Sequence, residues 1–172
     1  KVYAIDSCIN SSSKSLINVL RISNLLNSEY KNKLHFFKGD IREKNLLRKI
    51  FFEANKNDEK ISSVIHFAGI KSVSESISKP ITYWENNVNG TINLLRIMEE
   101  FDCKKIVFSS SASIYGFKEN SMVDEGSEIK PTNPYGMTKF VNEQFLKDVF
   151  LSSPNKWKIA NLRYFNPIGA HY

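Results

Sequence analysis

Short apolar runs alternate along this chain with longer stretches whose apolar residues recur at helical spacing. The short runs predict strands at residues 2–5, 34–38, 64–67, 106–108 and 159–164. The helical spacing predicts helices near residues 13–26, 45–51, 81–101 and 134–149. Strands that alternate with helices indicate parallel β-α-β units. The predicted fold class is therefore α/β, with a doubly wound parallel sheet.

Polar residues follow the predicted strands at the points where the strands end. The strands are apolar without alternation, as expected when helices cover both faces of a Rossmann-like sheet. Ligands of such sheets bind outside the carboxyl ends of the strands. The polar and glycine positions at these ends are Asp6, Asp40, Gly69, Ser109 to Ser111, and Asn166. This edge is where we expect a binding site.

Composition and charge exclude several classes of function. The 172 residues are 41% hydrophobic and 24% charged, which suits one soluble globular domain. The net charge is +6, but the lysines are scattered among Asn, Ser and acidic residues, so nucleic acid is not an expected partner. No apolar stretch approaches the ~20 residues of a membrane span. We expect a cytoplasmic protein with reduced Cys8 and Cys103, and no metal site.

Tyr135 and Lys139 stand four residues apart on the last predicted helix, a spacing that puts both on one face. A nearby ammonium favours the phenolate form of a tyrosine. The phenol could then accept a proton from an alcohol near neutral pH. Such pairs also occur on exposed helices with no catalytic role, so the spacing alone leaves both interpretations open.

Ser111 and Asp6 add chemistry to this pair. Ser111 follows the strand that precedes the Tyr135 helix, and a hydroxyl there can hydrogen-bond a reacting oxygen. The chain has no G-x-S-x-G motif, which excludes an α/β-hydrolase serine. Asp6 ends the first strand, where a carboxylate can accept hydrogen bonds from both hydroxyls of an adenosine ribose. The same carboxylate would repel a 2′-phosphate, which favours NAD over NADP. The alternative for Asp6 is a turn or helix-cap residue.

With these residues in place, the chain resembles the extended short-chain dehydrogenase/reductase family. Within it, the match is to the nucleotide-sugar epimerases that interconvert UDP-glucose and UDP-galactose. The matching strings cover essentially the whole chain: Gly39 to Arg42 (GDIR), His66 to Lys71 (HFAGIK), Asn86 to Thr91 (NNVNGT), Ser109 to Gly116 (SSSASIYG), Asn133 to Gly136 (NPYG) with Lys139, and Arg163 to His171 (RYFNPIGAH).

The resemblance implies a cofactor, NAD, and a role for each matching residue. The implied cofactor contacts are Asp6, Ser7, Asn10, Ser11, Asp40, Ile41, Phe67, Ala68, Gly69, Lys71, Asn86, Ser109, Tyr135, Lys139 and Phe165. The implied substrate contacts, for a UDP-sugar, are Lys71, Ser111, Tyr135 and Asn166. Tyr135, Lys139 and Ser111 would be catalytic, with Tyr135 as proton acceptor and a transient 4-keto sugar as intermediate. The family also implies a homodimer.

Related enzymes are the alternatives. Nucleotide-sugar 4,6-dehydratases resemble the chain, but they carry an Asp-Glu pair where Ala112 and Ser113 stand here. UDP-glucuronate decarboxylases usually have a glutamate in place of Ser113. UDP-glucuronate epimerases share the serine-rich strand end but differ in the strings around Lys71 and Asn166. From another class, a non-catalytic nucleotide-sugar-binding remnant is possible, although the presence of Ser111, Tyr135 and Lys139 argues against it.

The family's glycine-rich G-x-x-G-x-x-G turn has no counterpart among the seven glycines of this chain. We therefore expect residues 1–172 to be a partial NAD-binding domain, truncated at both ends, without the first strand and most of the substrate domain. Loss of a central strand exposes sheet edges. The isolated chain should bind NAD weakly and show negligible epimerase activity in a coupled assay. Robust turnover by purified residues 1–172 would contradict this expectation.

Overall fold

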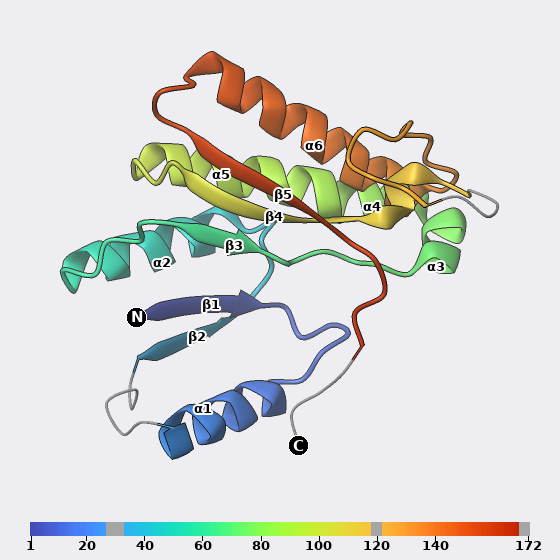
Figure 1. The fold of residues 1–172 in the computed structure, drawn as a ribbon. Helices are drawn as coiled ribbons and strands as arrows, with labels where there is room; N and C mark the ends of the chain where they lie inside the picture. Colours follow the sequence, from blue (N-terminus) through green and yellow to red (C-terminus); the bar gives the residue numbers. More distant parts are fainter. Residues whose placement is uncertain (27–32, 118–121, 169–172) are drawn as a thin grey trace. The chain divides into compact units, whose positions relative to one another are not determined.

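The computed structural model describes residues 1–26, 33–117 and 122–168, and only the backbone of residues 23–26. The chain forms two compact units, Lys1–Ile61 and Ser62–Tyr172. Their order along the sequence can be followed by colour in Figure 1. Each unit is built from parallel strands and helices, and each is described here separately.

The first unit contains two strands and two helices. Strand β1 (Val2–Asp6) pairs in parallel with β2 (Leu34–Lys38), from Val2 opposite Leu34 to Asp6 opposite Lys38. Helix α1 (Lys14–Leu26) follows β1, and α2 (Lys44–Lys56) follows β2. The buried hydrophobic residues of this unit lie largely on one face of α2, which carries Leu47, Ile50, Phe51 and Ala54 at helical spacing.

The second unit contains a three-stranded parallel sheet in the order β3-β4-β5. Its strands are β3 (Val64–His66), β4 (Lys105–Ser111) and β5 (Lys158–Tyr164). The register pairs His66 with Phe108, and Ser111 with Tyr164. The three strands therefore end along one edge, and the serines at residues 109–111 belong to the strand itself. This edge is where the candidate site residues of the second unit gather.

The helices of the second unit differ in part from the prediction. The single helix expected at residues 81–101 is divided into α4 (Pro80–Tyr83), a π-helical segment η2 (Trp84–Asn89) and α5 (Gly90–Glu100). A short helix that was not predicted, α3 (Val73–Ser78), precedes them and is capped by the Ser72 hydroxyl. A 3₁₀ turn, η3 (Ala112–Tyr115), follows β4, and α6 (Pro134–Ser152) matches the last predicted helix.

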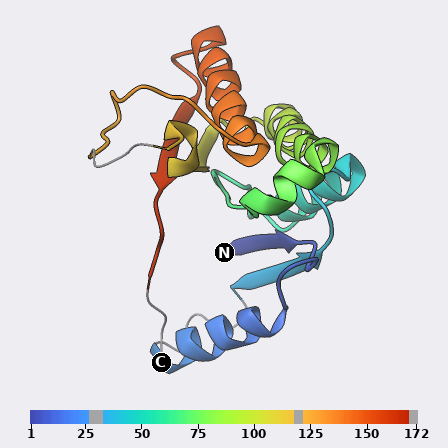
Figure 2. The ribbon, with the colours of Figure 1, turned by 90° about the vertical axis from the view of Figure 1, so that its right-hand side faces the viewer.

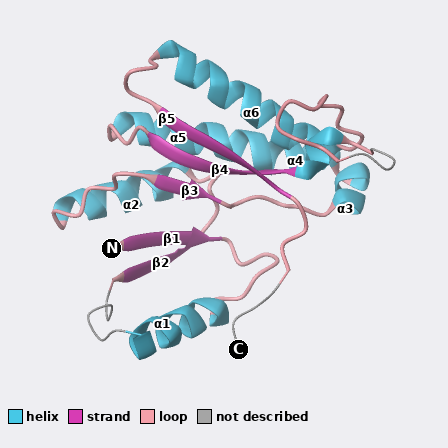
Figure 3. Cartoon of the chain, viewed as in Figure 1, coloured by secondary structure: helices cyan, strands magenta, loops and turns pink. Residues whose placement is uncertain are grey.

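The core of the second unit lies between its sheet and the helices on one face. Helices α5 and α6 run along the same face of β4 and β5 (Figure 2). On that face Ile106 and Phe108 alternate with less buried residues along β4. Leu95 and Met98 of α5 and Leu146 of α6 are buried as well. Residues 122–132 form a loop without helix or strand (Figure 3).

Parallel strands and flanking helices confirm the predicted Rossmann-like α/β class. The described strands form two sheets, β1-β2 and β3-β4-β5. A parallel sheet is continuous only where each inner strand bonds neighbours on both sides. Among the described strands, β1 pairs with β2 alone and β3 pairs with β4 alone, so the hydrogen-bond ladder is interrupted between them. No helix among the described residues is long and apolar enough to cross a membrane.

The start of α6 is held against η3 by a close backbone approach at Gly136. The Asn133 side chain caps the helix by accepting from the Gly136 amide at 2.8 Å, and Pro134 occupies the first turn. A Cβ added to Gly136 would lie 2.6 Å from the Ser113 carbonyl oxygen. Only glycine therefore lets the first turn of α6 rest on η3 without displacing backbone.

We expect Gly136→Ala to destabilise the protein by about 1–3 kcal/mol, because the methyl group has to push helix and turn apart. Gly126→Ala is the matched control, since its Cβ would meet only Asp124 Oδ1, at 3.6 Å. Urea unfolding of both variants measures the difference. Equal free energies of unfolding in the two variants would show that the approach at Gly136 is not tight.

Candidate active site

Helix α6 presents Tyr135 and Lys139 near its N-terminus, at the carboxyl end of β4. The predicted i, i+4 spacing is realised: Lys139 Nζ lies 5.9 Å from the centroid of the Tyr135 ring. The same Nζ donates a 2.7 Å hydrogen bond to the backbone oxygen of Ser109. This bond joins α6 to the end of β4. Its acceptor is the backbone carbonyl of Ser109, a residue predicted as a cofactor contact.

The Lys139 side chain is buried, with 5% of the residue exposed. Its ammonium also lies 4.9 Å from the centroid of the Phe108 ring, within reach of a cation–π interaction. Burial lowers the pKa of Lys139 from 10.5 to about 8, because the charged form loses its hydration. At neutral pH the group is still mainly cationic. An ammonium has three donors, and Ser109 takes one of them.

His66 lies fully inside the unit and is neutral. Burial, with a contribution from the Lys139 charge, lowers its pKa to about 3. Its Nε2 is 2.9 Å from Thr91 Oγ1, and that hydroxyl donates to the backbone oxygen of Asn87 at 2.6 Å. Since His66 stays uncharged across the physiological range, it serves as a packed polar residue and leaves Lys139 as the cation of this region.

Ser111 ends β4 with its side chain turned into the start of η3. Its hydroxyl oxygen accepts from the Ser113 amide at 3.2 Å, and its proton is directed to Ser113 Oγ, also at 3.2 Å. The residue is half-buried. The predicted hydroxyl at the strand end is thus present and oriented by the turn, in the same stretch of backbone as the Ser109 carbonyl.

The loop that follows β3 is fastened by Asn87, a residue that the sequence analysis did not select. The Asn87 amide accepts from the Ile70 amide and donates to the Ile70 carbonyl, both at 2.9 Å. It also donates to Thr138 Oγ1 at 3.1 Å. Asn87 is 2% exposed, so these bonds satisfy a buried amide and fix the loop against α6.

Gly69 occupies the point where this loop passes Lys139. Its φ is +155°, and an added Cβ would lie 3.0 Å from Asn87 Oδ1 and 3.8 Å from Lys139 Nζ. A side chain here would fill the space beside the ammonium. The predicted cofactor contact at Gly69 is therefore consistent with a backbone that must leave room next to Lys139.

The polar network continues through two further residues that sequence reasoning missed. Thr138 Oγ1 donates to the Tyr135 carbonyl at 2.7 Å, and Asn142 Nδ2 donates to the Asn87 carbonyl at 2.9 Å. Asn86, the predicted contact, is the half-buried neighbour of Asn87 in η2. The signal that could have found Asn87 was the doubled asparagine at residues 86 and 87 within the predicted helix.

In the first unit, Asp6 ends β1 as predicted. Its Oδ1 accepts from the Cys8 amide at 2.7 Å and from Ser11 Oγ at 2.8 Å. The turn role left open by the sequence is therefore real, and it orders the segment that holds the predicted contacts Ser7, Asn10 and Ser11. The ribose role stays a prediction.

Asp40 and Ile41 follow β2 in the same unit. Asp40 accepts from the backbone and side chain of Arg42, with Oδ2 2.8 Å from Nη2, and this pairing lowers the pKa of its carboxyl. Ile41 is buried. The carboxylate is therefore anionic and already paired with Arg42, while its predicted place beside an adenine stays a prediction.

The remaining predicted residues of the second unit are mostly exposed. Lys71, Phe67, Phe165 and Asn166 lie on the surface, Phe67 with its ring 6.3 Å from that of Tyr164. Ala68 is half-buried beside Gly69. His171, the last residue of the matching strings, lies outside the described residues.

The contacts described above thus bring together part of the predicted site. They join Gly69, Ser109, Tyr135 and Lys139, with Ser111 in the same strand end. The other cofactor positions of the second unit flank this cluster in sequence, and those of the first unit form their own group around Asp6. Within residues 1–26, 33–117 and 122–168, no group of three His, Cys, Asp or Glu side chains could hold a metal ion.

Comparisons with known proteins point to one enzyme family. The family model described as GDP-mannose 4,6 dehydratase matches residues 1–172. The chain is 46% identical over 162 residues to UDP-glucose 4-epimerase 2 of Oryza sativa subsp. japonica, covering 94% of this chain and 38% of that protein. It is 46% identical over 171 residues to UDP-glucose 4-epimerase of Yersinia enterocolitica, covering 99% and 47%.

Solved structures give the same result. The crystal structure of UDP-glucose 4-epimerase from Bifidobacterium longum, in complex with NAD+ and UDP, superposes with a TM-score of 0.88 at 41% identity. The superposition covers 99% of this chain and 48% of that one. The chain therefore spans about half the length of the relatives it matches, or less.

The lowered pKa of Lys139 predicts a pH dependence of stability. Between pH 8 and 10.5 the unfolded chain binds more protons at this residue than the folded protein does, so the free energy of unfolding should rise with pH in that window. The rise is at most about 1.4 kcal/mol per pH unit. Urea unfolding of the cofactor-free complete protein, compared with Lys139→Met across this window, isolates the effect. If the two proteins differ in free energy of unfolding by the same amount at every pH, the Lys139 side chain is exposed to solvent and its pKa is not lowered.

Proposed function

Because this chain belongs to the extended short-chain dehydrogenase/reductase family, we propose that it forms part of an NAD-dependent epimerase that interconverts UDP-glucose and UDP-galactose. The observation that carries the proposal is the buried Lys139 ammonium. It donates to the Ser109 carbonyl, and its Nζ lies 5.9 Å from the centroid of the Tyr135 ring. The relatives named UDP-glucose 4-epimerase, at 46% identity, support the substrate class.

The residues present fit a dinucleotide such as NAD. Lys139 has donor capacity beyond its bond to Ser109, and the missing side chain of Gly69 leaves space beside it for ribose hydroxyls. Asp6, at the end of a parallel strand, has the acceptor oxygens that an adenosine ribose needs. When bound, NAD supplies the reversible oxidation of the sugar at C4. Phe165 is proposed to lie by the nicotinamide, and Lys71 and Asn166 near the sugar.

The chain's own residues are proposed to handle the proton. Tyr135 accepts the proton of the sugar 4-hydroxyl and later returns it to the 4-keto oxygen. Lys139, cationic at neutral pH, orients the ribose through its remaining donors. Ser111 donates a hydrogen bond to the reacting oxygen, which requires its hydroxyl to turn from Ser113 towards the sugar.

A 4,6-dehydratase is the second candidate, since the matching family model bears that description. Elimination of water from the sugar needs an additional acid–base pair beside the tyrosine. In this chain the two positions after Ser111 are Ala112 and Ser113, and the Ser113 hydroxyl is hydrogen-bonded to Ser111. Neither side chain can act as a carboxyl acid or base at neutral pH, which favours epimerisation.

Conversion of UDP-galactose to UDP-glucose by the complete protein, measured in a coupled assay, tests the proposal. We expect Tyr135→Phe to lower kcat by about 10²–10⁴-fold, because the proton acceptor is removed. Tyr83→Phe is the control: it removes a phenol from α4 that contacts Glu75, outside the cluster, and should leave kcat unchanged.

Each other outcome has a separate meaning. A 6-deoxy-4-keto product from UDP-glucose would support the dehydratase. Activity in neither wild type nor variant, with UDP-sugar binding retained, would support the non-catalytic remnant. Homodimer formation, expected from the family, stays a prediction that light scattering of the complete protein can test.

A further inference from the structure

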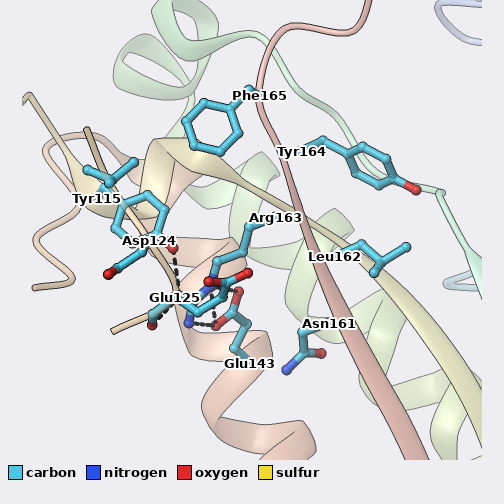
Figure 4. Close-up of a pocket in the computed structure, with 10 residues that line it drawn as sticks. Tyr115, Asp124, Glu125, Glu143, Asn161, Leu162, Arg163, Tyr164 and Phe165 are labelled. Carbon is cyan, nitrogen blue, oxygen red and sulfur yellow. Dashed lines mark hydrogen bonds and ion pairs between the residues drawn. The ribbon is translucent and has the colours of Figure 1, made fainter. Parts of the chain in front are cut away.

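Arg163 is a residue to which no role in the site has been assigned. It lies on β5 opposite Ser110 of β4, two residues before Phe165. Figure 4 shows its side chain directed towards α6, in a cavity lined by residues of β5, of α6 and of the loop around Asp124. The guanidinium lies among carboxylate, phenol and carbonyl oxygens, so the cavity is suited to holding this cation.

Glu143 of α6 is the principal partner of Arg163. The distances are 2.8 Å from Nη2 to Oε2 and 3.1 Å from Nε to Oε1, the two-pronged geometry that a guanidinium makes with a carboxylate. The Glu143 side chain is only 4% exposed, and that of Arg163 is 19% exposed. A carboxylate buried to this extent is tolerated because it is paired.

The other end of the guanidinium reaches two further segments. Nη1 donates to the Tyr115 hydroxyl at 2.8 Å and to the Glu125 carbonyl at 3.1 Å. The Tyr115 ring lies 5.3 Å from Arg163 Cζ and is itself buried. One side chain therefore joins α6, the last residue of η3, the loop at residue 125 and strand β5.

Three of these four segments adjoin residues of the proposed chemistry. Glu143 stands one turn beyond Lys139 on α6, and Tyr115 ends the turn that begins after Ser111. β5 leads directly into Phe165 and Asn166. A lysine could supply the charge of Arg163 but not its planar fork, which pairs with both oxygens of Glu143 and still leaves Nη1 to donate to Tyr115 and Glu125.

We propose that Arg163 is a positioning residue, which with Glu143 and Tyr115 fixes the proton-transfer helix α6 relative to the strand that presents the sugar contacts. The proposal rests on the proposed function for its catalytic consequence. Arg163 does not touch the reacting atoms. It acts by holding Tyr135 and Lys139 in register with residues 165 and 166, so that its loss misaligns a proton transfer that depends on short distances.

The test separates positioning from stability. Arg163→Met alone leaves Glu143 as an unpaired buried charge and should lower the melting temperature. In Glu143→Leu/Arg163→Met an apolar pair replaces the ion pair, and such replacements often preserve stability. In the complete enzyme we expect this double variant to melt close to wild type, while kcat falls about ten- to a hundredfold and KM changes by less than about threefold. We expect Arg163→Lys to show the same fall in kcat as the double variant, because lysine keeps the charge but lacks the planar fork.

A matched control and a second readout complete the experiment. Glu99→Gln, on α5, removes the ion pair between the exposed Glu99 carboxylate and Lys104, and should leave kcat unchanged. Amide hydrogen exchange, which needs no epimerase activity, should become about tenfold faster in residues 122–125 and 163–166 of the double variant and stay unchanged in α5.

The outcomes distinguish the two proposals. An inactive wild type contradicts the epimerase function, and the exchange data then decide the role of Arg163 independently. A double variant with wild-type kcat and unchanged exchange overturns the positioning role. A raised KM with unchanged kcat overturns it as well, because it would assign Arg163 to substrate binding.

Discussion

The candidate site depends on one buried positive charge. Transfer of an ammonium from water into the protein costs several kcal/mol unless the surroundings compensate. Here the compensation comes from the Ser109 carbonyl at 2.7 Å and from the faces of the Phe108 and Tyr135 rings. The incomplete compensation appears as a pKa of about 8 for Lys139. The same burial means that the field of this charge is only weakly screened by solvent.

The surroundings of this charge are built from neutral polar groups. Asn87 ties the loop after β3 to α6 through Ile70 and Thr138, and its backbone oxygen is taken up by Thr91 and Asn142. Two protein donors to one helical carbonyl are compatible with the π-helical segment in which Asn87 lies, where the regular ladder is altered. One turn further along α6, Glu143 is paired with Arg163, so its carboxylate is already compensated.

The sequence predicted all five strands, the α/β class and the Tyr135–Lys139 pair, because each rests on local spacing. It missed α3, since six residues with mixed polarity give no helical period. It also missed Asn87 and Arg163, whose partners stand 17 and 51 residues away for Asn87 and 20 and 48 residues away for Arg163. Polar pairs at such separations leave no trace in a periodicity, and their chemistry does not distinguish them from surface residues.

By itself, the sequence determined which side chains are available and where each stands within its own element. A phenol and an ammonium four residues apart share a helix face whatever the helix packs against, and an apolar run ending in serine places hydroxyls at a strand end. Only the tertiary structure decided that the ammonium is buried, that a carbonyl of β4 receives it and that Gly69 passes beside it. Burial and partner choice follow from how elements pack, and it is packing that converts a common pair of residues into a charge with a lowered pKa.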